Sequence, residues 1–268
     1  MNVYFSRKFR LMTLIQKIED GVCYLRLNRP EVFNSFNREM ALALQSALKD
    51  AAGNEEIRAI VLTGEGKAFC AGQDLAEAVD PDGPELQSIV KEHYNPIIEL
   101  ICTIEKPVIA AVNGVAAGAG ANIALACDIT FAKKSAAFIQ AFSKIGLIPD
   151  SAGTFFLPRI VGYQKAMALF MTGDKVTAEE AERMNMIYKV VEDEELDAVV
   201  SQFAKQLAQM PTRGLGLTKR AVNKTWANNL TQQLAVEEEL QTEAGNSYDF
   251  NEGVQAFLEK RKPVFKGK

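Results

Sequence analysis

The sequence has few of the residues from which metal sites, disulfide frameworks and histidine-based triads are built. Its 268 residues include one histidine, His93, and four cysteines that are widely spaced and form no C-x-x-C pair. No histidine stands at metal-ligand spacing from a cysteine, so we expect no metal site. A Ser-His-Asp triad would have to use His93. We expect the cysteines to be buried free thiols, as in proteins of a reducing cytosol.

Long apolar runs and a strong charge of either sign are also missing. No run approaches the roughly 20 residues that span a bilayer, and the net charge is -4 without a basic stripe. We therefore expect a cytoplasmic protein that binds neither membrane nor nucleic acid. Residues 1–11 are basic and aromatic, too short and too charged for a signal peptide. We expect them to form a separate N-terminal arm.

Strand and helix patterns alternate along most of the chain, and only helical patterns follow. Hydrophobic residues make up 48% and charged residues 24%, as in ordinary globular proteins. The patterns predict, in chain order, a hairpin over 13–27 turning at Glu19-Asp20-Gly21, a helix capped by Asn37, a strand over 59–63, a helix over 85–104, a strand over 107–112, helical structure over 153–172, a capping box at Thr177 and a strand over 187–191. This order indicates an α/β core over residues 12–200 and a helical region over residues 201–268.

The helix expected over 85–104 carries the single histidine. Its apolar face consists of Leu86, Val90, His93, Ile97 and Ile101. A histidine on such a face is typically packed or half-exposed, so we interpret His93 as a structural residue.

A glycine-rich turn follows the strand over 107–112 and leads into a segment of small apolar residues. The turn is Gly118-Ala119-Gly120-Ala121. A strand that enters a helix through glycines leaves free N–H groups at the positive end of the helix dipole. The N–H of Ala119 is therefore placed to bind a carbonyl oxygen that gains negative charge. Close packing of a small-residue helix explains the same glycines equally well.

Asp150 ends the segment Ile145-Gly146-Leu147-Ile148-Pro149-Asp150. We interpret it as an acid/base that faces the glycine-rich turn. On the residues alone, an N-cap for the helix that follows Ser151 is the more frequent role of such an aspartate.

Four motifs in this order resemble the crotonase superfamily of enoyl-CoA hydratases and isomerases. They are Asn28-Arg29-Pro30 with Asn34, residues 68–75, residues 107–128 and residues 256–262. The resemblance covers nearly all of residues 12–268. It implies a spiral of ββα units with a C-terminal helical trimerisation region, assembled as a homotrimer or a dimer of trimers.

The resemblance also implies an acyl-CoA substrate and a backbone binding site for its thioester oxygen. The two N–H groups of this oxyanion hole fall on Gln73 and Ala119. Residues for the CoA moiety fall on Arg29, Ala71, Asp74, Leu75 and Lys260, with Lys260 acting across a subunit boundary. No cofactor is implied, because CoA enters as part of the substrate. Solvated surface lysine is an equally frequent role for a residue such as Lys260.

The catalytic side chains depart from the hydratase pattern. The two glutamates that hydratases use to activate water fall on Asn122 and Phe142, which with Leu147 we assign to the substrate pocket. Asp150 falls where dienoyl-CoA isomerases and 4-chlorobenzoyl-CoA dehalogenases carry a functional aspartate. The string from residue 141 to 150 is especially similar to ring-1,2-epoxyphenylacetyl-CoA isomerases of phenylacetate degradation.

The resemblance therefore predicts an isomerase with a single catalytic aspartate. Such an enzyme moves a double bond from a 3-enoyl to a 2-enoyl thioester, converts ring-1,2-epoxyphenylacetyl-CoA to oxepin-CoA, or does both. A hydratase of low activity and a non-catalytic acyl-CoA-binding protein are the alternatives.

Overall fold

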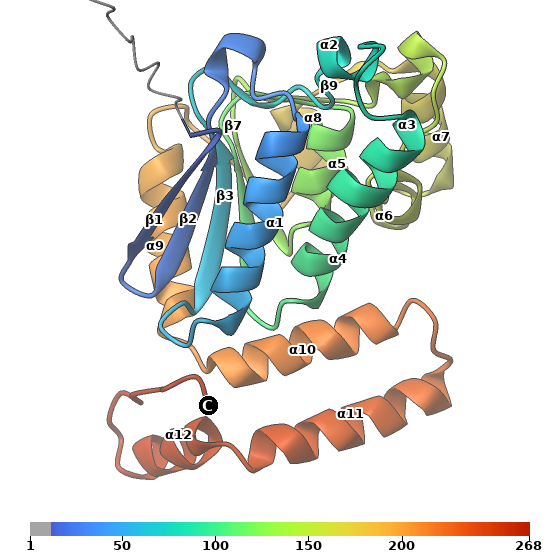
Figure 1. The fold of residues 1–268 in the computed structure, drawn as a ribbon. Coiled ribbons are helices and arrows are strands. Elements are labelled where there is room, and N and C mark those ends of the chain that lie inside the picture. The colour runs from blue at the N-terminus through green and yellow to red at the C-terminus, as the bar shows by residue number, and fades with distance from the viewer. Residues whose placement is uncertain (1–11) are drawn as a thin grey trace, which may run out of the picture.

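The computed structural model describes residues 12–268, and the arm predicted for residues 1–11 lies outside the described residues. Two β-sheets form the core (Figure 1). The larger sheet has the strand order β1 (Leu14–Glu19), β2 (Val22–Leu27), β3 (Ala59–Gly64), β5 (Val108–Val112), β7 (Ile129–Lys133) and β10 (Lys189–Val191). The smaller sheet has the order β4 (Ala68–Cys70), β6 (Val115–Ala117), β8 (Ala137–Ile139) and β9 (Lys175–Thr177).

From β3 to β8 successive strands alternate between the two sheets, and a helical element follows each pair. Strands β3, β5 and β7 pair in parallel in the larger sheet, and β4, β6 and β8 pair in parallel in the smaller one. The helical elements of the core are η1 (Pro30–Val32), α1 (Arg38–Gly53), α2 (Leu75–Ala78), α3 (Leu86–Ser88), η2 (Ile89–Tyr94), α4 (Asn95–Thr103), α5 (Ala119–Ala126), η3 (Ala141–Ile145), α6 (Gly153–Val161), α7 (Tyr163–Thr172), α8 (Ala178–Arg183) and α9 (Leu196–Ala208). The repetition confirms the predicted spiral of ββα units.

Short sequence signals set several of these elements. Asp20 and Gly21 both have positive φ, 50° and 77°, in the two-residue turn that joins β1 to β2. The Asn37 side chain accepts from the N–H of Met40 and caps α1. Thr177 and Glu180 form the expected capping box of α8. The hairpin and both helix starts are confirmed.

The central strands β3 and β5 of the larger sheet are buried on both faces, whereas the edge strand β1 is mostly exposed. In β3, Ile60 and Leu62 pack toward α1, α4 and α5, whereas Val61 packs toward α9. This alternation follows from the two-residue period of a strand. The boundary predicted between the α/β core and the helical region, at residue 201, falls inside α9. The second half of α9 packs on the larger sheet together with the first half.

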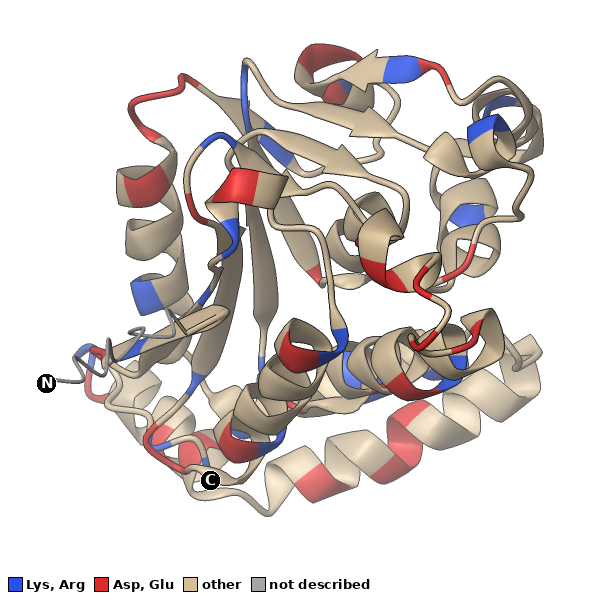
Figure 2. Cartoon of the chain, turned by 45° about the horizontal axis from the view of Figure 1, so that its top comes forward, with Lys and Arg blue, Asp and Glu red and all other residues tan. Residues whose placement is uncertain are grey.

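The remaining helices form a layer below the core in Figure 1. They are α10 (Thr212–Lys224), α11 (Leu230–Gly245) and α12 (Tyr248–Leu258). Lys219 of α10 reaches Asp128 at 2.8 Å, and Arg58 donates to the Thr212 hydroxyl at 2.8 Å and to the Phe265 carbonyl at 2.9 Å. Figure 2 shows acidic and basic residues interspersed over the described chain rather than gathered in a basic stripe.

The predicted helix over 85–104 contains a π-helical turn, η2, between α3 and α4. The extra residue of a π turn rotates the face that points to the core. Ile89 is consequently buried and Leu86 is 50% exposed. The expectation that Leu86 lies on the same apolar face as His93 was therefore wrong, and Val90 is half-buried. His93 is fully buried, with its Nε2 3.3 Å from Arg38, and has a structural position.

The helical stretch expected over 153–172 is divided into α6 and α7 at Gly162, whose φ is 82°. All four cysteines are free, and three are buried: Cys23, Cys70 and Cys127. Burial raises the pKa of the Cys70 thiol to about 12, so it stays protonated and unreactive. The prediction of free thiols is confirmed, and that of burial holds for three of them, since Cys102 is half-buried.

Candidate active site

The first loop of the site follows β4 and is fixed by the segment before α1. The N–H of Phe36 donates to the Gly72 carbonyl at 2.7 Å, and the Phe36 carbonyl accepts from Asp74 at 2.8 Å. Because the Gly72–Gln73 peptide is planar and trans, its N–H points opposite to its carbonyl. The Gln73 N–H therefore points away from Phe36.

The second loop is the glycine-rich turn between β6 and α5. Gly118 has φ 53° and ψ -128°, a conformation that favours glycine, and its N–H donates to the Ile139 carbonyl at 2.9 Å. Ala119 is the first residue of α5, so its N–H has no acceptor within the helix. The helix dipole adds positive potential at this point.

Glycines allow the two loops to touch. A Cβ atom at Gly72 would lie 3.5 Å from the backbone nitrogen of Ala119, and one at Gly120 would lie 2.4 Å from the Cys70 carbonyl oxygen. The predicted oxyanion-hole residues Gln73 and Ala119, which lie far apart in the sequence, are thus brought together. Their assignment as thioester ligands stays a prediction.

Asp150 lies in a turn with strained backbone. Ser151 and Ala152, which follow it, have φ of 50° and 59°, a region that costs non-glycine residues energy and is found at functional sites. The N-cap of α6 is Ala152 without a side-chain bond, so the alternative that Asp150 caps this helix was wrong. Its carboxylate accepts from the Ser151 hydroxyl at 2.9 Å. Burial raises the pKa of Asp150, which makes its carboxylate a stronger base.

Asn122 holds the Asp150 turn against α5. Its Nδ2 donates to the Asp150 carbonyl at 2.8 Å, and its Oδ1 accepts from Gln140 at 2.8 Å. A Cβ at Gly153 would lie 2.3 Å from Nδ2. Asn122, which was predicted to line the substrate pocket, is therefore buried with both ends of its amide bonded within the protein. These bonds hold the backbone of Asp150 in place.

Phe142 and Leu147, the other predicted pocket residues, stand beside the glycine-rich turn. The Phe142 ring lies 3.8 Å from the position of a Cβ at Gly118 and is 6% exposed. The N–H of Leu147 donates to the Phe142 carbonyl at 3.0 Å, and its side chain is 39% exposed. An apolar ring thus stands at the position that the resemblance assigns to the second glutamate of hydratases.

The predicted CoA-binding residues have separate positions. Arg29 and Asp74 form an ion pair at 2.8 Å, and Arg29 also donates to the Ser35 carbonyl at 2.7 Å. This ion pair connects the segment before α1, which carries Arg29, to the first loop, which carries Asp74. Ala71 and Leu75 are exposed beside this pair. Lys260 follows α12, which lies on the opposite side of the molecule from α2 in Figure 1. Within a single chain Lys260 therefore lies far from the first loop.

Three residues that contact the site carried no sequence signal: Tyr94, Gln140 and Ser151. Tyr94 donates to the Gln73 side chain at 2.8 Å, Gln140 orients the Asn122 amide, and Ser151 binds the Asp150 carboxylate. Only the packing of separate elements brings the first two to their partners.

The comparison with known proteins agrees with this arrangement. The sequence profile of enoyl-CoA hydratases/isomerases matches residues 17–268. The chain belongs to this family. It is 50% identical over 258 residues to the 1,2-epoxyphenylacetyl-CoA isomerase of Escherichia coli K12, covering 95% of this chain and 98% of that protein.

Two further relatives illustrate the range of the enoyl-CoA hydratase/isomerase family. A protein of Rhodobacter capsulatus named probable enoyl-CoA hydratase is 47% identical over 256 residues, covering 96% of this chain and 98% of that protein. The crystal structure of an enoyl-CoA hydratase/isomerase from Mycobacterium abscessus has a TM-score of 0.90 and 37% identity, covering 95% and 100% of the two chains. The predicted family and fold are confirmed.

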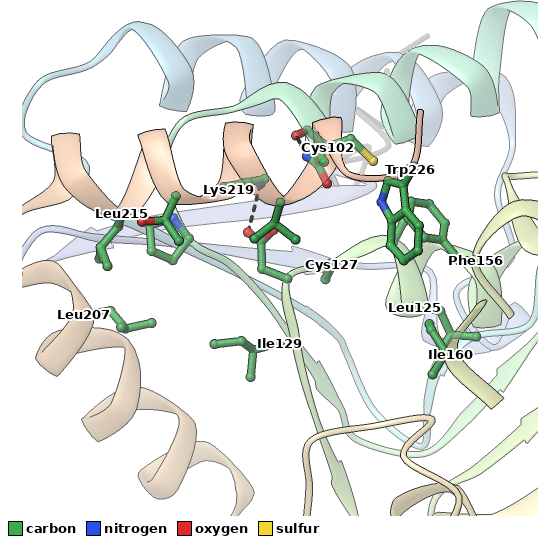
Figure 3. A pocket seen from close by; sticks show the side chains of 16 residues that line it. Cys102, Leu125, Cys127, Ile129, Phe156, Ile160, Leu207, Leu215, Lys219 and Trp226 are labelled. Atoms are coloured by element: carbon green, nitrogen blue, oxygen red, sulfur yellow. Dashed lines mark hydrogen bonds and ion pairs between the residues drawn. The ribbon is translucent and has the colours of Figure 1, made fainter. Parts of the chain in front are cut away.

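A cavity of about 380 Å³ lies away from the two loops, between α10 and the C-terminal end of α5. Figure 3 shows Phe156, Ile160 and Trp226 at one side of it and Lys219 bonded beneath α10. None of the predicted site residues lines this cavity.

Within residues 12–268, no group of three or more His, Cys, Asp or Glu side chains is arranged to hold a metal ion. Among the same residues, no helix has both the length and the apolar character needed to cross a bilayer.

Proposed function

We propose that this protein is an acyl-CoA isomerase with Asp150 as its acid/base and the N–H groups of Gln73 and Ala119 as its oxyanion hole. The observation that supports it is a half-buried carboxylate in a turn that Asn122 binds to α5, the helix that begins at the glycine-rich turn. The resemblance places the two hydratase glutamates at Asn122 and Phe142. Asn122 cannot take a proton from water at neutral pH, and its amide already binds the Asp150 turn.

In the proposed mechanism the thioester carbonyl oxygen accepts from both backbone N–H groups. Donors aimed at developing charge stabilise the enolate and acidify the C2 proton. Asp150 removes this proton and returns it to C4, so a 3-enoyl thioester becomes the conjugated 2-enoyl thioester. The raised pKa of Asp150 brings its basicity closer to that of an effective general base near neutral pH.

The proposed native substrate is ring-1,2-epoxyphenylacetyl-CoA, which the enzyme would rearrange to oxepin-CoA. The Escherichia coli relative carries this substrate in its name and is 50% identical over nearly the whole chain. The name of the Rhodobacter relative favours a hydratase as the second candidate. A non-catalytic acyl-CoA-binding protein is the third.

The proposal includes the assembly and location of the enzyme. No cofactor is required, since CoA serves as the handle of the substrate. We assign the helical region to a homotrimer or dimer of trimers in the cytoplasm, in which Lys260 of one chain meets the CoA bound to another. Sedimentation of the purified protein as a monomer would contradict this assembly.

The test is proton NMR of a 3-enoyl-CoA incubated with the protein in deuterated water. We expect the conjugated 2-enoyl product without accumulation of the 3-hydroxy product. Asp150→Asn is nearly isosteric but cannot act as a base, so turnover should fall by about 10²- to 10⁴-fold. Asp174→Asn, at an exposed position after α7, is the matched control and should retain wild-type turnover.

Three results would contradict the proposal. Accumulation of the 3-hydroxy product would indicate a hydratase. Near wild-type turnover by Asp150→Asn would exclude the single-aspartate mechanism. Binding without turnover of both the 3-enoyl thioester and the ring epoxide would indicate a binding protein.

A further inference from the structure

A buried hydroxyl lies beside the first loop of the site and has no part in the mechanism above. Tyr94 is the last residue of η2 and is 1% exposed. Its hydroxyl donates to Oε1 of Gln73 at 2.8 Å. Its ring packs edge-on against Phe36, with centroids 5.8 Å apart and an interplanar angle of 68°. Tyr94 therefore contacts both Gln73 and Phe36, whose backbone binds the residues on either side of Gln73.

The π turn places Tyr94 at this point. A π turn is less stable than an α-helical turn and is often retained where a side chain has a function. Here it moves the buried face by one position, so that Ile89 and Tyr94 point inward while Leu86 faces solvent.

The Gln73 side chain is held at both ends. While its Oε1 accepts from Tyr94, its Nε2 donates to Glu77 at 3.1 Å. Glu77 in turn accepts from the backbone N–H of Arg38 at 3.0 Å, at the start of α1. The side chain thus connects η2, α2 and α1, and it cannot change rotamer without breaking a bond to one of them.

The Tyr94 hydroxyl keeps its role as donor under all ordinary conditions. Burial, followed by nearby acidic groups that include Asp150, holds the pKa of Tyr94 well above its usual value. The hydroxyl consequently remains protonated, and the Gln73 amide oxygen remains its acceptor.

We propose that Tyr94 is a positioning residue of the oxyanion hole, which fixes the direction of the Gln73 backbone N–H through the Gln73 side chain. The inference rests on the proposed function, since it assigns this N–H to an acyl-CoA thioester. Tyr94 does not touch the thioester in this arrangement. It limits the freedom of the loop that does.

The test uses cinnamoyl-CoA, a 3-aryl-2-enoyl thioester whose absorption band moves to longer wavelength when hydrogen bonds polarise its carbonyl. The purified protein should produce this shift. In Tyr94→Phe we expect the shift to fall by about half and kcat on 3-enoyl-CoA to fall about tenfold, as for loss of one buried hydrogen bond. KM should stay within about twofold, because the contacts to CoA are unchanged.

Tyr24→Phe is the matched control. Tyr24 also makes one side-chain hydrogen bond, to the Ser201 hydroxyl at 2.9 Å, but it lies on the α9 face of the sheet. This variant loses a comparable bond far from the loops, so the band shift and kcat should both equal those of the wild type. It separates a general loss of stability from a change at the oxyanion hole.

A double-mutant cycle tests the route through the side chain. Gln73→Met keeps the backbone N–H but removes both the acceptor of the Tyr94 bond and the donor to Glu77, so it should lose at least as much as Tyr94→Phe. The double variant should lose no more than Gln73→Met alone, because the Tyr94 hydroxyl then has no amide to orient. Losses that multiply in the double variant would overturn the inference.

The spectroscopic result distinguishes this inference from the proposed function. A full band shift with unchanged kcat in Tyr94→Phe would overturn the role of Tyr94 and leave the oxyanion hole intact. The absence of any shift in the wild type with bound cinnamoyl-CoA would overturn both.

Discussion

Replacing Gly120 by alanine tests whether contact between the two loops sets the distance between their N–H donors. Gly120 is the second residue of α5. An added Cβ would lie 2.4 Å from the Cys70 carbonyl oxygen and 2.8 Å from its sulfur. The nearest of these atoms belongs to backbone, so no side-chain rotation relieves the overlap. The helix and the first loop must move apart.

The structure gives the size of the effect. Alanine raises helix propensity by about 1 kcal/mol over glycine, whereas overpacking of a close contact costs about 1–3 kcal/mol. We therefore expect a net loss of about 0–2 kcal/mol in the free energy of unfolding. Relief of the overlap requires a movement of about 1 Å, and a misplacement of that size costs about 10²-fold in rate. Turnover should fall far more than stability.

Two measurements check this prediction at one protein concentration: urea unfolding and kcat/KM on 3-enoyl-CoA. Gly53→Ala is the control, because no atom lies within 4 Å of a Cβ built at Gly53, the last residue of α1. It should leave turnover unchanged and alter stability by less than about 1 kcal/mol. If Gly120→Ala keeps more than half of the wild-type kcat/KM, the contact between the loops does not set the oxyanion geometry.

Three further predictions follow from single contacts. Burial raises the pKa of Asp150, so turnover should fall as the pH drops through that pKa. At a pH above that pKa the ionised carboxylate destabilises the folded state. Asp150→Asn should therefore raise Tm at neutral pH, and this gain should disappear in acid. Asn122→Asp turns an oxygen toward the Asp150 carbonyl and should lower kcat about tenfold, whereas Asn223→Asp, which breaks a similar bond on α10, should not. Lys219→Met leaves the partly buried Asp128 carboxylate without its cation and should cost about 1–3 kcal/mol in urea unfolding. A neutral Lys219→Met would show that the pair does not hold α10 to the core.

Part of the fold was predictable because it depends on neighbouring residues. The hairpin turn requires only that Asp20 and Gly21 accept positive φ, and the caps of α1 and α8 require only a side chain that reaches back within one turn. The apolar runs of β3 and β5 likewise identify strands buried on both faces. Such patterns are complete within a few positions.

The site was predictable from the sequence in outline. The resemblance identified Gln73, Ala119 and Asp150, and the structure brings the two loops of the first pair together and places a half-buried carboxylate in the turn that Asn122 binds to α5. The resemblance also placed Asn122 in the substrate pocket, which stays a prediction, but it gave no sign that the Asn122 amide binds the Asp150 turn. A motif gives the position of a residue along the chain, but not the partners of its side chain.

What the sequence by itself determined was the family, five of the six strands of the larger sheet (the hairpin of β1 and β2, then β3, β5 and β10), the helix caps, and the segments that form the site, whereas β7 and the four strands of the smaller sheet were not predicted. Only the tertiary structure decided the π turn that buries Tyr94 and the bonds from Tyr94 to Gln73, from Gln140 to Asn122 and from Arg29 to Asp74, which span 21, 18 and 45 residues. No local period or cap specifies contacts of this range. They form because the core fixes the elements that carry both partners, and the side chains then bind the nearest polar group that burial leaves to them.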